Sequence, residues 1–289
     1  MQNSPMSLGK DPVEPVRICD DLWYLGSESV GCYVLRTSMG LVLFDATNDV
    51  DADKNILQPG LEKIGLQDEK VLAILIMHGH FDHYLGAAKI HQRTGCEVAM
   101  SEKDAAFMMF SQENLDSEGQ VQGGFYPHIT RLLHDDETLL FGGHDVHVIN
   151  GNGHTPGCLN FSFTVHEKGK AHRAVIMGGL AVFGPGFYPG KEYPYSREWA
   201  VEQALNFATS CDHLWQYCER YGCDIYLNSH PVRCNLFETA ERNKDARCNE
   251  FIDGLIGVKR YIKERFDCCM KAASGYSSFY DEENGHESN

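Results

Sequence analysis

The sequence lacks the features that place a protein in a membrane or carry it out of the cell. No window approaches the run of about 18 apolar residues that a membrane-spanning helix requires. Residues 1–16 contain neither the basic start nor the apolar core of a secretory signal peptide. We therefore expect a cytoplasmic chain without a membrane partner, in a compartment that keeps most thiols reduced.

Clusters of positive charge are also missing. The chain has 25 Lys and Arg against 41 Asp and Glu, which gives a formal net charge of −16. Nucleic acids and anionic membranes are held by clustered basic side chains, so the charge argues against both as partners. We expect a small-molecule substrate instead, and the oligomeric state is left open.

Cysteines are numerous, but they follow no metal-binding repeat. The 11 cysteines include no CxxC motifs of the zinc-ribbon kind. Free cysteine is among the residues most often buried, so most of these thiols are interpreted as small core side chains.

The pattern of apolar residues predicts one domain of sheets and helices. Strands are expected in two blocks, each followed by helices, which is typical of a sandwich of two sheets with helices outside. The fold class is thus α/β (α+β). A long helix is expected over 197–221, and Pro59 is expected to break or kink a helix over 51–65. The expected divisions are an N-terminal extension (1–16), the folded domain (17–272) and a disordered tail (273–289).

The most informative segment is His78-Gly79-His80-Phe81-Asp82-His83, directly after the apolar run 71–77. Such a run predicts a strand buried on both faces, so these polar side chains stand at a strand end. Three imidazoles and a carboxylate serve no packing purpose in a turn, but together they suit borderline divalent metals, above all zinc. One segment of this kind can supply two metals that lie about 3.5–4 Å apart.

Two further histidines follow predicted strands in the same way. His154 lies in the tight turn Gly153-His154-Thr155-Pro156-Gly157, and His230 lies in Asn228-Ser229-His230-Pro231. Active sites gather at loops beyond strand ends, so both are candidate metal ligands. The remaining histidines are interpreted as ordinary, except His128, which lies in a long loop over 111–130 that could cover the site.

The order and spacing of these motifs resemble the metallo-β-lactamase superfamily. The segment Gly40-Leu-Val-Leu-Phe-Asp45 is also similar to that family's strand ending in an aspartate beneath the metals. The resemblance covers about residues 17–260 and implies a four-layer αββα sandwich with one or two zinc ions. It implies that His78, His80 and His154 hold the first zinc, that Asp82, His83 and His230 hold the second, and that Asp45 supports them.

The chain departs from many two-zinc members of that superfamily at one position. Where they place a bridging aspartate, this chain reads Met177-Gly178-Gly179-Leu180-Ala181, without carboxylate or thiol. This absence resembles the third subclass (B3-like) of metallo-β-lactamases, whose second zinc takes an aspartate and two histidines. Some members of the subclass bond the equivalent of Cys223 to a later cysteine. Cys248 is the candidate partner here, and both could equally stay reduced.

The substrate side of the site differs from that subclass as well. Serines that commonly contact the β-lactam carboxylate there are replaced by Gly179 and Ala181. Arg233 could supply the carboxylate partner instead, and an aromatic-rich loop could form an apolar substrate wall. The substrate-binding candidates are Tyr126, His128, Phe183, Phe187, Tyr188 and Arg233.

These observations predict a zinc-dependent hydrolase with two zinc ions per chain. Zinc lowers the pKa of bound water to about 7, and the metal-bound hydroxide, oriented by Asp82, would attack the carbonyl of a β-lactam or other cyclic amide, or of an ester. A lactonase or thioesterase of the same fold is the alternative. A di-iron redox site is disfavoured because Gly178 and Gly179 offer no extra carboxylate. A non-catalytic metal-binding member is disfavoured because all six ligand positions are filled.

Overall fold

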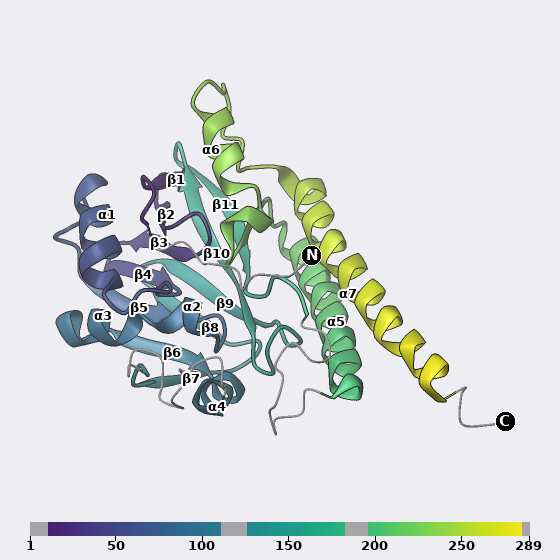
Figure 1. Ribbon diagram of the computed structural model, residues 1–289. Coiled ribbons are helices and arrows are strands. Elements are labelled where there is room, and N and C mark those ends of the chain that lie inside the picture. Colours follow the sequence, from purple (N-terminus) through teal and green to yellow (C-terminus); the bar gives the residue numbers. More distant parts are fainter. Residues whose placement is uncertain (1–10, 111–125, 183–195, 285–289) are drawn as a thin grey trace.

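Two β-sheets face each other, and helices cover the outer face of each (Figure 1). The computed structural model describes residues 11–110, 126–182 and 196–284, and for residues 109–110 and 276–284 it describes the backbone alone. Helices α1, α3 and α4 lie on one side of the molecule, and α5 and α7 pack against each other on the opposite side. The predicted αββα sandwich is confirmed.

The first sheet has seven strands in chain order, antiparallel from β1 to β4 and parallel from β4 to β7. The strands are β1 (Val16–Cys19), β2 (Leu22–Gly26), β3 (Gly31–Thr37), β4 (Gly40–Phe44), β5 (Val71–Leu75), β6 (Glu97–Ser101) and β7 (Arg131–Leu133). The helical segments between them are η1 (Asp53–Leu57), α1 (Gln58–Lys63), α2 (Phe81–Tyr84), α3 (Ala87–Thr94) and α4 (Glu102–Phe110).

The second sheet has five strands in the order β12-β11-β10-β9-β8, antiparallel except for the parallel pair of β11 and β12. The strands are β8 (Thr138–Phe141), β9 (His144–Asn150), β10 (Leu159–Glu167), β11 (Lys170–Met177) and β12 (Ile225–Asn228). The helical segments of this half are α5 (Arg197–Tyr221), η4 (Pro231–Arg233), α6 (Leu236–Asn243) and α7 (Gly254–Asn284).

Strand β4 shows why the strands that support the site are apolar throughout. Successive side chains of a strand point to opposite faces. Accordingly, Val42 and Phe44 join the core between the sheets, whereas Leu41 and Leu43 join the core beneath α1 and α3. Both faces of the strand are therefore buried, and the loops at its end and at the end of β5 are held on a rigid base.

The long helix α5 matches the prediction at both ends. The Ser196 hydroxyl accepts a hydrogen bond from Trp199 N at 3.2 Å, which is an N-cap contact. Gly222 ends the helix in the left-handed region at φ 69°, where a residue without Cβ is favoured.

Of the break or kink expected at Pro59, the break is wrong, because the chain stays helical from η1 through α1. In the π-helical turn η1 the Gln58 N–H donates to the carbonyl of Asp53, five residues back. Proline has no N–H, and its ring clashes with the carbonyl four residues earlier in an α-helix. The wider π turn just before Pro59 accommodates the ring without ending the helix.

The C-terminal segment is more helical than its composition predicts. Helix α7 continues to Asn284, well into the segment expected to be disordered. Cys269 and Ala273 are buried, and extending an existing helix costs far less than starting one. The division of the chain at residues 16 and 272 stays a prediction.

Two further predictions concern the cysteines and membrane-spanning helices. Every cysteine in the described ranges is free, including Cys223, which is buried near the Ser162 hydroxyl, and Cys248, which is exposed. The possible Cys223–Cys248 disulfide is therefore not formed in this structure. Among the described residues, no helix has the length and apolar character that would let it cross a membrane.

Candidate active site

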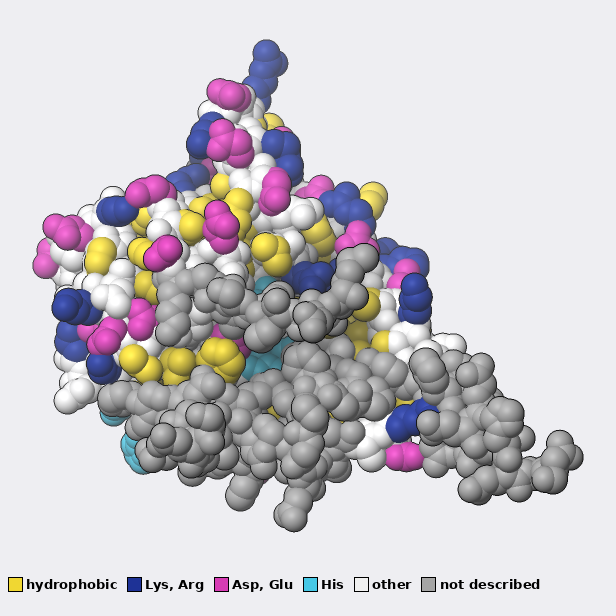
Figure 2. Space-filling model, viewed as in Figure 1, with side chains coloured by type: hydrophobic (Ala, Val, Ile, Leu, Met, Phe, Trp, Pro, Cys, Tyr) yellow, Lys and Arg dark blue, Asp and Glu magenta, His cyan; other side chains and the backbone are white. Residues whose placement is uncertain are grey.

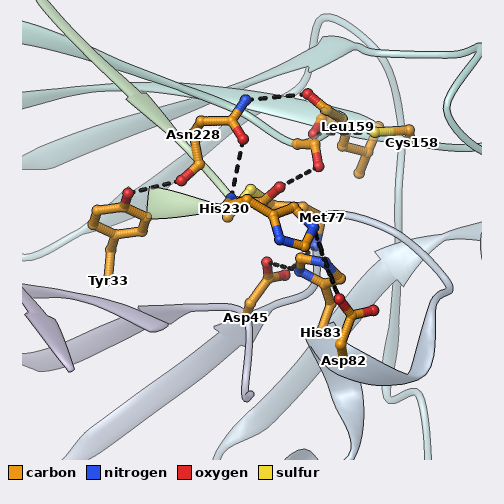
Figure 3. A network of polar contacts seen from close by, with 12 residues as sticks. Tyr33, Asp45, Met77, Asp82, His83, Cys158, Leu159, Asn228 and His230 are labelled. Atoms are coloured by element: carbon orange, nitrogen blue, oxygen red, sulfur yellow. Dashed lines mark hydrogen bonds and ion pairs between the residues drawn. The ribbon is translucent and has the colours of Figure 1, made fainter. Parts of the chain in front are cut away.

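Three loops bring the predicted ligands together where the strands end. Figure 3 shows Asp82, His83 and His230 of this set, with Asp45 beside His83. The loop after β5 carries His78 and His80, and the short helix α2 that follows it carries Asp82 and His83. His154 lies between β9 and β10, and His230 follows β12. All six predicted ligands are buried.

His78, His80 and His154 form the first cluster. The ring centroid of His78 lies 4.8 Å from that of His80 and 4.5 Å from that of His154, and His80 and His154 are 4.8 Å apart. One ring nitrogen of each lies within 4.8 Å of the others. Three imidazoles at this spacing can ligate a single metal ion.

Asp82, His83 and His230 form the second cluster. His83 Nε2 lies 3.3 Å from His230 Nε2 and 3.4 Å from Asp82 Oδ2. His230 Nε2 lies 3.7 Å from the same carboxylate oxygen. The rings of His78 and His83 are only 3.9 Å apart, so the two clusters adjoin.

The outer edges of three imidazoles are held by acceptors that fix the tautomer. His154 Nδ1 donates to the carbonyl of Ala181 at 2.6 Å, and His230 Nδ1 donates to that of Ser29 at 3.1 Å. His83 Nδ1 contacts Asp45 Oδ2 at 2.6 Å. A proton on Nδ1 leaves the lone pair at Nε2, which is how metal-bound histidines are usually oriented.

Asp45 contacts His83 of the second cluster. It is fully buried directly after β4, and its other oxygen accepts the Met77 N–H at 2.8 Å. Its φ of 66° is unusual for a residue other than glycine, and such backbone strain concentrates at functional sites. Asp45 thereby ties His83 to the end of β5.

Burial keeps most of the imidazoles neutral. It lowers the pKa of His80 to about 3, and burial together with nearby His83 lowers that of His230 to about 4. The pKa values of His78 and His154 are lowered well below the usual range for the same reason. A neutral imidazole is the form that binds a metal.

His83 is the exception, because two carboxylates face it. Burial opposes its protonation, but Asp82 and Asp45 outweigh burial and raise its pKa to about 10. The same contacts lower the pKa of Asp82. The carboxylates therefore create a strongly negative environment that favours a bound cation.

The donor set fits a pair of divalent metal ions. Five imidazoles and one carboxylate match the nitrogen and oxygen ligands that zinc takes. In the described part of the chain, neither ring nitrogen of the buried His78 has a hydrogen-bond partner. Burial without a partner is costly, and a metal would satisfy one of these atoms.

Asp104 links two of the three ligand-bearing loops, a role that the sequence did not suggest. Its Oδ2 accepts the Gly79 N–H at 2.8 Å, between His78 and His80. Its Oδ1 accepts the Gly157 N–H at 2.6 Å, and the Thr155 hydroxyl donates to Oδ2. Burial raises the pKa of Asp104 to about 6, so the carboxyl is still mostly ionised at pH 7. From the sequence, Asp104 is only an acidic residue in the first turn of α4.

Gly179 packs closely against His154 of the first cluster. A Cβ at this position would lie 2.7 Å from His154 Cβ and 2.5 Å from Phe207 Cε2, both closer than real side chains approach. His154 therefore packs directly against this glycine. A side chain at residue 179 would displace His154 before it could reach a metal.

The predicted substrate residues have mixed outcomes. The Tyr126 ring packs near that of Tyr84 in α2, with centroids 6.2 Å apart, against the apolar core that contains Tyr84. Arg233 is exposed in η4, and its positive charge contributes to lowering the pKa of His230. His128 is exposed. Phe183, Phe187 and Tyr188 lie outside the described residues.

Histidine side chains reach the surface near the centre of the face in Figure 2, beside basic side chains.

Known proteins resemble part of this chain. A family model described as the metallo-beta-lactamase superfamily matches residues 26–166. The hydroxyacylglutathione hydrolase GloC of Haemophilus influenzae is 30% identical over 146 residues, which are 45% of this chain and 66% of that protein. A probable metallo-hydrolase of Burkholderia pseudomallei is 25% identical over 44% of this chain and 43% of its own length. The matched region thus covers about two thirds or less of these curated relatives.

Solved structures resemble the whole fold. The native FEZ-1 metallo-beta-lactamase of Legionella gormanii has a TM-score of 0.74 at 23% identity, covering 97% of this chain and 99% of its own. BJP-1, a subclass B3 metallo-beta-lactamase of Bradyrhizobium japonicum, has a TM-score of 0.75 at 19% identity, covering 95% and 99%. Together with the family model and the strand-end histidines, these findings show that the chain belongs to the metallo-β-lactamase superfamily.

Proposed function

We propose that the chain is a zinc-dependent hydrolase of acyl compounds and that a β-lactam amide is its leading substrate class. The convergence of Asp82, His83 and His230, at 3.3 to 3.7 Å, beside the three-histidine cluster carries the proposal. Zinc fits these donors and, when bound, supplies hydroxide at neutral pH. The fold shared with solved B3 enzymes supports the same function.

The chain's own residues would divide the work. His78, His80 and His154 would hold one zinc, and the second cluster would hold the other. Asp82 has two carboxylate oxygens, so it can contact a metal and also orient the attacking water. Asp45 would keep His83 in place, because it holds Nδ1 at 2.6 Å.

Two residues would contact the substrate. Arg233 is exposed close to His230, and among the described residues no carboxylate forms an ion pair with it, so its guanidinium could bind a substrate carboxylate. The Tyr126 ring beside α2 would form part of the apolar wall. His128, Phe183, Phe187 and Tyr188 stay candidates for the same surface.

A lactone or thioester substrate is the second candidate. Gly179 and Ala181 lack the hydroxyls that would contact a β-lactam carboxylate, and a curated relative is a hydroxyacylglutathione hydrolase. Hydrolysis of either class needs the same attack on a carbonyl carbon. The choice therefore depends on the pocket rather than on the metals.

A substrate panel tests the proposal. Zinc-loaded protein would be assayed with nitrocefin, an acyl lactone and a hydroxyacylglutathione thioester, before and after removal of zinc by a chelator. We expect nitrocefin to have the highest kcat/KM, and we expect every activity to vanish with the metal and to return with added zinc. Faster cleavage of the lactone or thioester would overturn the β-lactam assignment. If protein that is shown to contain zinc cleaves none of the three substrates, the proposal that the chain is a hydrolase is wrong.

Arg233→Ala tests the carboxylate contact. A charge-assisted hydrogen bond is worth about 1.5–3 kcal/mol, so the KM of a carboxylate-bearing substrate should rise at least about tenfold while kcat changes little. Arg247, which is also exposed, provides the matched control, and Arg247→Ala should leave KM unchanged. An unchanged KM in Arg233→Ala would exclude this residue from substrate binding.

A further inference from the structure

A second group of metal-type side chains lies far from the candidate active site. It consists of Asp21, in the turn between β1 and β2, His144, the first residue of β9, and His166 in β10. One ligand atom of each lies within 4.8 Å of the others. His154 follows the far end of β9, and the 7 residues of that strand span about 20 Å at about 3.3 Å each. The group is thus at the opposite end of the sandwich.

Most polar atoms of this group have assigned partners. Asp21 Oδ1 accepts the backbone N–H of His166 at 2.8 Å, and Asp21 Oδ2 contacts His166 Nδ1 at 2.7 Å. His144 Nδ1 lies 2.9 Å from the carbonyl of Thr164. A carbonyl oxygen only accepts, so Nδ1 of His144 carries the proton and the neutral ring has its lone pair at Nε2.

The contact between His144 and Asp21 is the one that indicates a metal ion. His144 Nε2 lies 3.9 Å from Asp21 Oδ2, which is too far for a hydrogen bond. In the neutral ring, a lone pair thus lies near a carboxylate oxygen, and a cation between the two atoms would stabilise both. Ligands of a tetrahedral zinc, at about 2.0–2.2 Å from the metal, are roughly 3.4 Å apart. The separations of 2.7 and 3.9 Å lie on either side of that value.

We propose that Asp21, His144 and His166 form an additional zinc site, separate from the candidate active site. Two imidazoles and a carboxylate are a donor set that zinc accepts, with water completing four-fold coordination. Binding through Nδ1 of His166 would leave the ring proton at Nε2. The His166 side chain is 45% exposed, so that atom can be hydrated.

The position of this site indicates a structural role. Asp21 lies in the turn between two strands of the first sheet, and both histidines belong to strands of the second. The sheets already meet here through the Asp20 N–H, which donates to the His166 carbonyl at 2.9 Å. A zinc ion would add a cross-link between the sheets, and metal binding that requires the folded arrangement stabilises it.

The chain contains a matched control. His172 Nδ1 contacts Asp224 Oδ2 at 2.6 Å, so this pair reproduces the contact between His166 and Asp21. Among the described residues, no third ligand-type side chain joins the pair to make a metal-binding group. If a histidine–aspartate pair alone captured zinc, His172 would contribute as much as His166.

The test counts zinc in the wild-type protein and in four variants. Wild type, His144→Gln, His166→Asn and His172→Gln would be dialysed against the same free zinc concentration, and bound metal would be measured by atomic emission. We expect His144→Gln and His166→Asn each to bind about one zinc fewer than wild type, and His172→Gln to match wild type. Asp21→Asn, which keeps an acceptor for the His166 N–H, guards against loss of folding and should also lose one.

Two results would overturn the site. One is an equal zinc content in wild type, His144→Gln and His166→Asn. The other is an equal loss in His172→Gln, which would assign the metal to surface histidines in general. Because each result is a difference from wild type, it does not depend on how many zinc ions the candidate active site holds or on whether the protein hydrolyses a β-lactam.

Discussion

His78→Ala is expected to lower kcat/KM for the preferred substrate by about a thousandfold or more and to abolish tight zinc binding. A ring nitrogen of His78 belongs to the group with His80 and His154 and also to the group with Asp82 and His83. Its loss therefore removes a ligand where the two clusters adjoin. Metal ions supply several kcal/mol of transition-state stabilisation, and about 4 kcal/mol corresponds to a thousandfold. Steady-state kinetics and zinc content measured on one preparation check both effects.

The fold should survive this substitution. In the described part of the chain His78 makes no hydrogen bond, so its removal leaves no partner unsatisfied, and circular dichroism should show wild-type secondary structure. His134→Ala, at an exposed histidine, is the control and should keep full activity and zinc content. A folded His78→Ala protein with wild-type activity would refute a metal mechanism.

Local sequence signals account for the parts of the fold that were predicted most closely. Helix α5 begins after a serine cap and ends at a left-handed glycine, and both signals lie within a few residues of the ends they specify. The ligand loop after β5 is similar, because the buried strand and the polar segment are adjacent in sequence. The positions of His154 and His230 beyond strand ends made them candidate ligands, and the resemblance to a family implied which of the two metals each one holds.

The contacts that orient the ligands could not be predicted from local sequence signals. The Ala181 and Ser29 carbonyls hold two of the imidazoles, but every residue has a carbonyl and its use depends on how distant loops meet. The π turn before Pro59 likewise depends on a helix that packing maintains. Asp104 is the clearest case. Its place in the sequence indicates only an acidic residue near the start of a helix, whereas its side chain accepts hydrogen bonds from two other loops.

Asp104→Ala is expected to weaken zinc binding by about 10- to 100-fold and to destabilise the fold by about 2–6 kcal/mol. The substitution leaves the Gly79 and Gly157 N–H groups without their acceptor, and each buried unsatisfied donor costs about 1–3 kcal/mol. Groups that position metal ligands typically contribute 10- to 100-fold in metal affinity. Competition with a chromophoric chelator would measure the affinity, and urea unfolding of metal-free protein would measure the stability.

Asp104→Asn separates positioning from packing, because asparagine fills the same volume but replaces one acceptor oxygen with a donor. It can accept from either Gly79 or Gly157, not from both, so one ligand loop stays anchored while the other is released. We therefore expect losses of zinc affinity and stability that are smaller than those of Asp104→Ala. Asp68→Ala, at an exposed aspartate, should change neither quantity. If Asp104→Ala lost stability but bound zinc as tightly as wild type, Asp104 would be a packing residue and the ligand loops would hold their geometry without it.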